Sequence, residues 1–241
     1  MRAPPAQPHL ADSATPRPDD DRVVSAWLTH LRYQWDDLTQ GARSRSVAKD
    51  EMLFLEGQPA DTVYVIQEGR VRLTSFGFDG KERHLLIIGP SGLVGDCSLR
   101  ATHLYTVSAV AATDSLVLMV PAARMMSALV HDPRMAAQHQ QLAGMRFRIL
   151  LRHVAVQGAN SSRRRVCLHL LDLVHSYGKP HRLGQVISIS FTQQEMGSIC
   201  GLSRVSVSQT FSQLERERVI ARDGRLVVVL DPARLDVLSR T

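Results

Sequence analysis

The stretch GLSRVSVSQTFSQLE, residues 201–215, carries the side chains with the clearest potential for specific chemistry. Its apolar residues recur at near-helical spacing, so they would share one face of a helix. These residues are Leu202, Val207, Phe211 and Leu214. The remaining face is rich in Ser, Arg and Gln and has one acid, Glu215. Because arginine can bond guanine and glutamine can bond adenine through two parallel hydrogen bonds, this face is suited to reading base edges in duplex DNA.

The flanking residues predict the elements that would hold this helix in place. Thr192 followed by Glu195 forms a capping box that starts a first helix, and Gly201 permits the tight turn before the second. The segment RDGRLVVVLD, residues 222–231, is predicted to close the chain as a β-hairpin. This order of elements predicts a winged helix-turn-helix, whose second helix enters the major groove. The apolar residues expected to set the angle between the two helices are Met196, Ile199, Leu202, Val207 and Leu214.

The exposed side chains of this predicted unit each have an expected DNA contact. Arg204 and Gln209 would read guanine and adenine, whereas Val205 offers only a methyl contact, for instance to thymine. Hydroxyl groups and the amides at the helix starts suit phosphate oxygens, and Arg225 at the hairpin tip suits the adjacent backbone. The predicted DNA-binding residues are Thr192, Gln193, Ser203, Arg204, Val205, Ser206, Ser208, Gln209 and Arg225. The alternative is a merely solvated helix face.

The charge of the whole chain agrees with a polyanionic partner. The 241 residues carry a formal net charge of +6, with a pI of about 9.7. Residues 158–241 hold 12 Lys and Arg against 7 Asp and Glu, whereas residues 1–157 hold 17 against 16. The positive charge is therefore concentrated in the third of the chain that contains the predicted winged helix.

Several classes of protein are disfavoured by what the sequence lacks. Cys97, Cys167 and Cys200 are far apart and form no CxxC pair, which argues against a disulfide framework and predicts a cytoplasmic protein. No apolar run is long enough to cross a bilayer, so no membrane partner is expected. There is no P-loop, nucleophile elbow, paired-carboxylate motif or zinc signature, so we expect a binding protein and not an enzyme.

Four segments are predicted along the chain. Residues 1–22 contain five of the 11 prolines and no signal-peptide core, and are expected to be a disordered tail. A helix is expected from about Asp21, with its apolar face formed by Val24, Trp27, Leu28, Leu31 and Trp35. Short strand-like runs separated by regular glycine turns fill residues 23–130 and predict an antiparallel β-roll, or jelly roll. The fold class is therefore α+β, with a dimerisation helix at 131–158 and the winged helix at 159–241.

The predicted helix at 131–158 has an apolar seam with a seven-residue period. The seam consists of Met135, Leu142, Met145, Ile149 and Val156. Three heptads of this kind favour pairing with the same helix of a second copy, which predicts a homodimer. The alternative is that the seam packs against the chain's own β-roll.

The segment from Phe191 to Asp231 resembles the DNA-binding segment of the CRP/FNR family, the regulators named for the cyclic-AMP receptor protein. The resemblance extends upstream through EGQPADTVYVIQEGRVRLTSFGFDGKE and the long helix, and covers about residues 23–230. It implies a cytoplasmic, homodimeric transcription regulator that binds a near-palindromic DNA site and contacts RNA polymerase. It also implies a small effector in the β-roll that shifts the dimer between DNA-binding states.

Two departures from the family pattern concern ligand recognition. Where the cyclic-AMP receptor has an Arg-Glu pair and a second Arg on its recognition helix, this chain has Arg204, Val205 and Gln209, so its operator should differ. The family's effector cassette clamps a cyclic phosphate with an Arg that is absent here. The residues that match the effector pocket are Gly95, Asp96, Cys97, Tyr105, Thr106, Leu150 and Leu151.

These departures argue against cyclic AMP and leave the effector unknown. A more apolar ligand, a differently bound nucleotide such as cyclic di-GMP, and a constitutive regulator without a ligand all stay open. An iron–sulfur cluster needs about four thiolates, which the three scattered cysteines do not supply. Haem also stays open, with Cys97, His103, His84 and His153 as the residues considered for an axial ligand. A pure ligand-binding module with the same β-roll is the competing class, and the winged helix argues against it.

Overall fold

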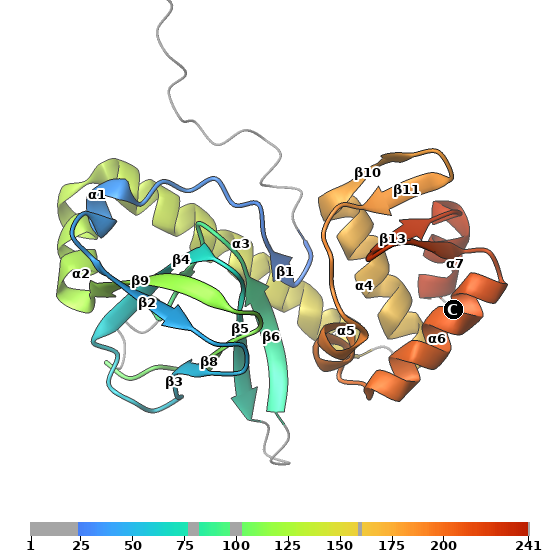
Figure 1. Cartoon of the computed structure of the whole chain (residues 1–241), viewed down its shortest axis with the longest axis horizontal. Helices are drawn as coiled ribbons and strands as arrows, with labels where there is room; N and C mark the ends of the chain where they lie inside the picture. Colours follow the sequence, from blue (N-terminus) through green and yellow to red (C-terminus); the bar gives the residue numbers. More distant parts are fainter. Residues whose placement is uncertain (1–23, 77–81, 97–102, 159–160, 241) are drawn as a thin grey trace, which may run out of the picture.

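The N-terminal unit is a β-roll. The fold is described from a computed structural model, which describes residues 24–76, 82–96, 103–158 and 161–240. Two sheets, of order β1-β6-β5-β8-β3 and β2-β9-β4-β7, face each other across an apolar core (Figure 1). The strands are β1 (Trp27–Leu28), β2 (Arg43–Val47), β3 (Met52–Phe54), β4 (Thr62–Glu68), β5 (Val71–Phe76), β6 (Glu82–Ile88), β7 (Leu93–Val94), β8 (Ser108–Ala111) and β9 (Ser115–Pro121). The predicted α+β class with an N-terminal β-roll is confirmed.

The helix expected from about Asp21 is not formed in the described part of that segment. Instead, Trp27 and Leu28 form the edge strand β1, which runs parallel to β6. The backbone amides of Ile87 and Gly89 donate to the carbonyls of Ala26 and Leu28. Both β1 side chains are fully buried, so the sheet edge and the core together stabilise an extended chain over the helix that spacing alone predicted. The predicted tail, residues 1–22, lies outside the described residues.

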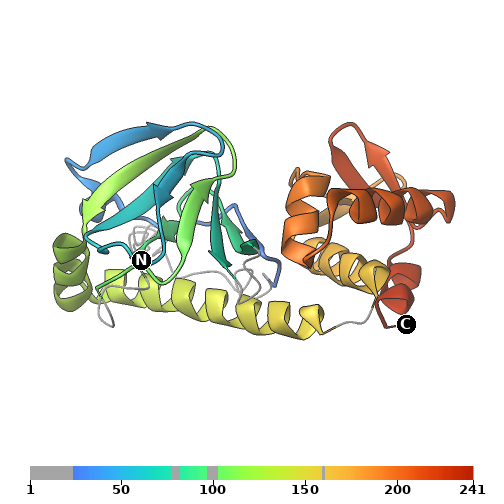
Figure 2. The same cartoon turned by 90° about the horizontal axis from the view of Figure 1, so that it is seen from below.

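The long helix α3 (Pro133–Gln157) follows the short helices α1 (Asp36–Thr39) and α2 (Ala122–His131). Its N-terminus is fixed by Asp132, whose carboxylate accepts hydrogen bonds from the amides of Arg134 and Met135, with Pro133 in the first turn. Figure 2 shows α3 running along the whole β-roll toward the C-terminal unit. This helix therefore connects the two ends of the molecule.

The seam predicted to form the dimer contact faces the chain's own core, which corrects that assignment. The five side chains, Met135, Leu142, Met145, Ile149 and Val156, are at most 4% exposed. Because they have almost no surface left in the single chain, they cannot supply the apolar area that a second copy would bury. A seven-residue period is equally satisfied by packing on a β-roll, and here the tertiary contact takes that face.

The opposite face of α3 is exposed and partly apolar. Phe147, Leu151 and Val154 are 63%, 56% and 70% exposed, and their spacing of four and three residues places them on one stripe. Gly144 and Ala137 continue the same stripe toward the N-terminus. This apolar stripe, and not the predicted seam, is the surface of α3 that is available to a partner.

The C-terminal unit is a helical layer on a four-stranded sheet of order β10-β11-β13-β12. Its elements are α4 (Ser162–Tyr177), β10 (Gly178–His181), β11 (Gly184–Ile187), α5 (Gln193–Cys200), α6 (Arg204–Arg216), β12 (Ile220–Asp223), β13 (Leu226–Val229) and α7 (Pro232–Arg240). The predicted hairpin is present as β12 and β13 but does not close the chain, because α7 follows it and packs against α4. Of the helices described, none is long and apolar enough to cross a membrane.

Candidate nucleic-acid interface and effector site

The two helices of the helix-turn-helix are fixed by local hydrogen bonds. At the start of α5, Thr192 Oγ1 accepts from the Glu195 amide at 3.0 Å, and Glu195 Oε2 accepts from the Thr192 amide at 2.7 Å. Gly201 ends α5 with a φ of 64°, a conformation that favours glycine. Ser203 caps α6 by accepting from the Ser206 amide at 3.1 Å. The predicted capping box and turn are therefore confirmed, and they set the first turn of α6 against α5.

Helix α6 separates into a buried face and an exposed face. The buried residues are Val207, Thr210, Phe211 and Leu214. The exposed residues are Arg204, Val205, Gln209, Ser212 and Arg216. Val205 is 64% exposed although it is apolar. The structure therefore places Arg204, Val205 and Gln209 on one open surface, with Ser208 partly exposed beside them.

The other predicted DNA-binding residues lie around this surface. Thr192 and Gln193 are at the N-terminus of α5, which packs against α6. The hydroxyls of Ser203 and Ser206 are 2.9 Å apart and bond each other. The two hydroxyls predicted to contact phosphate therefore also take part in the N-terminal cap of α6. Arg225 lies in the β12–β13 turn, after Gly224.

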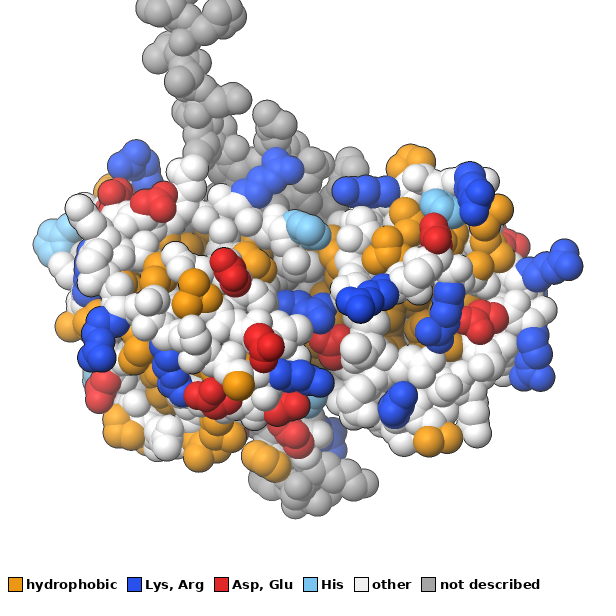
Figure 3. Space-filling view, viewed as in Figure 1, with side chains coloured by type: hydrophobic (Ala, Val, Ile, Leu, Met, Phe, Trp, Pro, Cys, Tyr) orange, Lys and Arg blue, Asp and Glu red, His pale blue; other side chains and the backbone are white. Residues whose placement is uncertain are grey.

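The acids near the end of α6 are paired with cations. Glu215 accepts from Arg222 at 2.8 Å, and Glu217 forms an ion pair with Arg163 at 2.5 Å. Their negative charge is therefore largely balanced within the unit. Figure 3 shows several Lys and Arg side chains over the winged-helix unit on the face toward the viewer. The charge of this surface suits a polyanion.

The residues predicted for the effector pocket come from three parts of the chain. Gly95 and Asp96 follow β7, Tyr105 and Thr106 precede β8, and Leu150 and Leu151 lie on α3. Cys97 lies outside the described residues. Asp96 and Tyr105 are buried, whereas Thr106 is exposed and Leu151 belongs to the exposed stripe of α3. The structure therefore buries Asp96 and Tyr105, leaves Gly95 and Leu150 half-buried, and leaves Thr106 and Leu151 at the surface.

Asp96 is held by two cationic or titratable side chains from α3. Arg146 Nη1 donates to both carboxylate oxygens at 2.8 Å, and His139 Nε2 lies 3.0 Å from Oδ2. Arg146 Nη2 also donates to the Leu93 carbonyl. Burial would raise the pKa of Asp96, but the charge of Arg146 and the contact with His139 lower it well below its usual range. The carboxylate is therefore ionised and bonded within the chain.

Tyr105 also fills its surroundings with contacts inside the chain. Its ring stacks on Phe54 at a centroid distance of 3.7 Å, and its hydroxyl donates to the Thr62 carbonyl at 2.6 Å. Burial raises the pKa of this phenol well above its usual value, so it acts as a neutral donor. A side chain at Gly95 would lie 3.0 Å from the Tyr105 ring. Tyr105 therefore occupies space beside the cassette and offers no free cation to a phosphate.

Arg146 and His139 are functional candidates that the sequence reasoning missed. The available signal was an arginine directly after the seam residue Met145 and three residues before Ile149, which places it at the edge of the apolar seam. A charged residue in such a position is buried only when it is paired. The partner could not be identified from spacing because Asp96 is 50 residues away.

Two histidines pack together where α3 meets α4. The rings of His153 and His169 have a centroid distance of 5.7 Å, and neither nitrogen of His169 has a hydrogen-bond partner among the described atoms. Burial, followed by the charges of His153, Arg152 and Arg165, lowers the pKa of His169 to about 3. His169 is therefore neutral at neutral pH, and no group of described residues has the arrangement of a metal site.

We expect His169 to make the fold less stable in mild acid. The unfolded histidine, with a pKa of about 6.5, takes up a proton before the buried one, so stability is full above pH 6.5 and falls as the pH drops toward 3. Between pH 7 and pH 5 the free energy of unfolding should fall by about 2 kcal/mol from this group. Urea unfolding at both pH values of the wild type and His169→Leu measures it. An equal pH dependence in the two proteins would contradict the assignment.

Two family models match the two units of the chain. The cyclic nucleotide-binding domain matches residues 44–132, and the Crp-like helix-turn-helix domain matches residues 164–238. Together they span more than half of the chain. The order of the two domains is the order seen in the structure, with α3 between them.

Whole-length relatives agree with this division. A CRP-like cAMP-activated global transcriptional regulator from Mycobacterium tuberculosis is 25% identical over 82% of this chain and 88% of its own. The fold is similar to that of a CooA variant from Carboxydothermus hydrogenoformans, with a TM-score of 0.76 at 17% identity over 89% of this chain and 99% of that one. It is also similar to the c-di-GMP-responsive regulator CLP from Xanthomonas campestris, with a TM-score of 0.62 at 19% identity over 79% and 94%.

The domain order, the helix-turn-helix geometry and the relatives lead to one assignment. A β-roll that matches the cyclic nucleotide-binding domain is joined by a long helix to a helix-turn-helix that matches the Crp-like domain. The chain belongs to the CRP/FNR family of DNA-binding transcription regulators.

Proposed function

We propose that the protein is a homodimer that binds a near-palindromic DNA site in the cytoplasm, reads bases with α6 and regulates transcription through RNA polymerase without catalysing a reaction. The observation that supports it best is the exposed face of α6, where Arg204, Val205 and Gln209 lie together above a buried apolar face. Side chains at the start of a helix-turn-helix recognition helix are those that reach base edges. Two such helices, one from each protomer, would enter successive major grooves.

The dimer contact is assigned to the exposed stripe of α3. Phe147, Leu151 and Val154 supply apolar surface that the single chain leaves in water. Gly144 one turn earlier allows close approach of a second helix, because it has no side chain to keep the two backbones apart. Pairing along this stripe would bury the most exposed apolar side chains of α3 and place the two winged helices at the same end of the dimer.

The regulatory ligand is proposed to be something other than cyclic AMP. The position of the missing phosphate clamp is taken by Tyr105, which donates inside the chain, and Asp96 is already bonded to Arg146. Relatives named for cAMP and for c-di-GMP show that the family takes different effectors. Cyclic di-GMP, a more apolar ligand and haem are the candidates.

A constitutive regulator without an effector is a second candidate, and one observation favours it. The buried Asp96–Arg146 pair connects the effector cassette to α3 by contacts within the chain alone. In this case the arrangement that a ligand would stabilise in other family members is held by an internal ion pair. Thermal unfolding with cyclic di-GMP and with haem separates these two candidates from the constitutive one, because a bound ligand raises the melting temperature. Cyclic AMP is expected to leave the melting temperature unchanged.

The first experiment is selection of duplexes from a random pool by the ligand-free protein. Fluorescence anisotropy on the winning sequence at several salt concentrations then gives specific affinity and phosphate contacts. Tight, sequence-selective binding supports the proposal and the constitutive candidate. The selection and the anisotropy are then repeated with cyclic di-GMP and with haem. Weak binding that ignores sequence, both without a ligand and with each of these two, would contradict the proposed function.

Gln209→Ala is expected to weaken binding to the selected operator by about 1–3 kcal/mol, because a bidentate contact to a base edge is lost. Binding to a scrambled duplex should change little, since phosphate contacts remain. Gln40→Ala, at an exposed position of the β-roll, is the control and should bind both duplexes as the wild type does. An equal loss on the operator and the scrambled duplex would remove Gln209 from base reading.

A further inference from the structure

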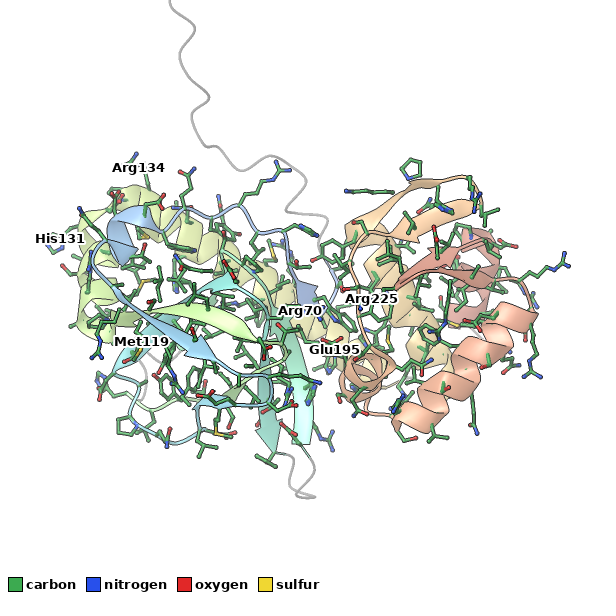
Figure 4. The ribbon with its side chains drawn as sticks, viewed as in Figure 1. Arg70, Met119, His131, Arg134, Glu195 and Arg225 are labelled. Carbon is green, nitrogen blue, oxygen red and sulfur yellow. The ribbon has the colours of Figure 1, made fainter. Side chains whose placement is uncertain are left out.

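Arg70 connects the β-roll to the first helix of the helix-turn-helix. Its Nη1 donates to the Ser190 carbonyl at 2.6 Å, and its Nη2 lies 3.2 Å from Glu195 Oε1. The side chains of Arg70 and Glu195 are only 20% and 12% exposed. Figure 4 shows the two residues beside each other at the boundary between the units. A guanidinium with two partners in a largely buried position is a directional contact, unlike a surface ion pair.

The backbone of Arg70 is held in place by hydrogen bonds within the β-roll. The Arg70 amide donates to Thr113 Oγ1 at 2.9 Å and to Ser115 Oγ at 3.1 Å, and the Arg70 carbonyl accepts from the Ala112 amide at 2.7 Å. Gly69 before it has a φ of 79°, and a side chain there would collide with Ser115. The backbone of Arg70 therefore has one position, set by the loop between β8 and β9.

The receiving end of the contact is the capping box of α5. Glu195 uses its two carboxylate oxygens for different partners: Oε2 accepts from the Thr192 amide, and Oε1 faces Arg70. Because α5 leads through Gly201 directly into α6, a shift at Glu195 moves the DNA-reading helix with it. Arg70 therefore acts on the orientation of α6 without lying in its exposed face.

A second group of contacts, near Arg70, joins the C-terminal unit to the β-roll. The ring of Trp27 packs on Phe191 with a centroid distance of 5.6 Å, and the Tyr177 hydroxyl donates to the Trp27 carbonyl. Close to these contacts, Ser176 Oγ accepts from the amides of Val24 and Ser25 at 3.1 and 3.3 Å. Arg70 adds a directed contact to the segment that leads into α5, because its partner Ser190 is adjacent to Phe191.

We propose that Arg70 is a positioning residue for DNA reading, which sets the spacing between the two recognition helices of a dimer by fixing α5 against the β-roll. This inference rests on the proposed function. The two half-sites of a palindromic site lie about 34–36 Å apart, and a dimer binds both only when its two α6 helices are held at that distance. A winged-helix unit that lacks the Arg70 contact would still bind a single half-site. It would discriminate less between the correct and an altered spacing of two half-sites.

The test compares Arg70→Ala with Arg72→Ala by fluorescence anisotropy. Arg72 lies two residues after Arg70, has a similarly buried side chain and pairs with Asp50 inside the β-roll at 2.9 Å, so it is a matched control. Three duplexes are used: the selected operator, the same half-sites with one base pair added between them, and a single half-site. Arg70→Ala should bind the operator about tenfold more weakly than the wild type does. Its loss of affinity should be smaller on the duplex with the added base pair, and its affinity for the single half-site should be unchanged. Arg72→Ala should match the wild type on all three.

Two further variants separate charge from fold. Glu195→Gln keeps a capping-box residue but removes the ion pair, so it should behave as Arg70→Ala does. Arg70→Lys keeps the charge with fewer directed bonds and should recover part of the operator affinity. Urea unfolding establishes that each variant is folded.

The outcomes distinguish this inference from the proposed function. If Arg70→Ala binds all three duplexes as the wild type does, Arg70 has no positioning role. If it loses equally on the single half-site, Arg70 acts through folding or direct DNA contact, and the inference also fails. If the wild type prefers no duplex over a scrambled sequence, the proposed function itself is wrong.

Discussion

Replacing Arg146 by alanine is expected to lower the free energy of unfolding by about 3–5 kcal/mol, because a buried carboxylate loses its cation. Asp96 is 4% exposed, and Arg146 reaches both of its oxygens at 2.8 Å. His139 would remain as a partner but is itself one-fifth exposed and carries a charge only when protonated. Urea unfolding at pH 7 measures the loss. Gln141→Ala, at an exposed position on the same helix, is the control and should change stability by less than about 0.5 kcal/mol.

The loss of stability in Arg146→Ala is expected to depend on pH in a defined direction. In the wild type the pKa of Asp96 is lowered, so its stabilisation is fully present above the unfolded pKa of about 3.9 and is lost only as the pH falls through the lower folded value. Without Arg146, burial raises that pKa, and a protonated Asp96 needs no cation. The difference between Arg146→Ala and the wild type should therefore be smaller at pH 4.5 than at pH 7. A difference that stays constant with pH would show that Arg146 stabilises by packing and not by charge.

Leu151→Lys is expected to convert the dimer into a folded monomer and to reduce operator affinity about a hundredfold or more, since one protomer would bind one half-site without the gain from linked sites. Leu151 is 56% exposed, so lysine fits the single chain but places a charge in the proposed contact. Ile149→Lys differs by two positions and should instead unfold the chain, because Ile149 is 1% exposed in the core. Size-exclusion chromatography with light scattering gives the mass, and circular dichroism gives the fold.

This pair of variants tests the choice of helix face directly. A folded monomer from Ile149→Lys together with a normal dimer from Leu151→Lys would restore the predicted seam and reject the exposed stripe. A dimer of normal mass from both would move the contact away from α3.

The sequence alone determined the winged helix, because its signals are local. The Thr192–Glu195 capping box, the glycine at 201 and the apolar spacing of α6 act within a few residues of each other, where helix geometry fixes the outcome. The β-roll was also predicted, since turn glycines and short apolar runs determine strand length. The sequence likewise identified an exposed face of α6 with Arg204 and Gln209 on it.

The tertiary structure decided which of two allowed arrangements each ambiguous segment takes. An apolar seam on α3 fits a second helix or a β-roll equally well, and only the folded chain shows that Ile149 faces inward and Leu151 outward. Trp27 and Leu28 have helical spacing but gain more from the edge of β6. The pairs Asp96–Arg146 and Arg70–Glu195 join residues 50 and 125 positions apart, and no spacing rule reaches that far. Periodicity determines which residues share a face, whereas the face that is buried depends on what the rest of the chain places against it.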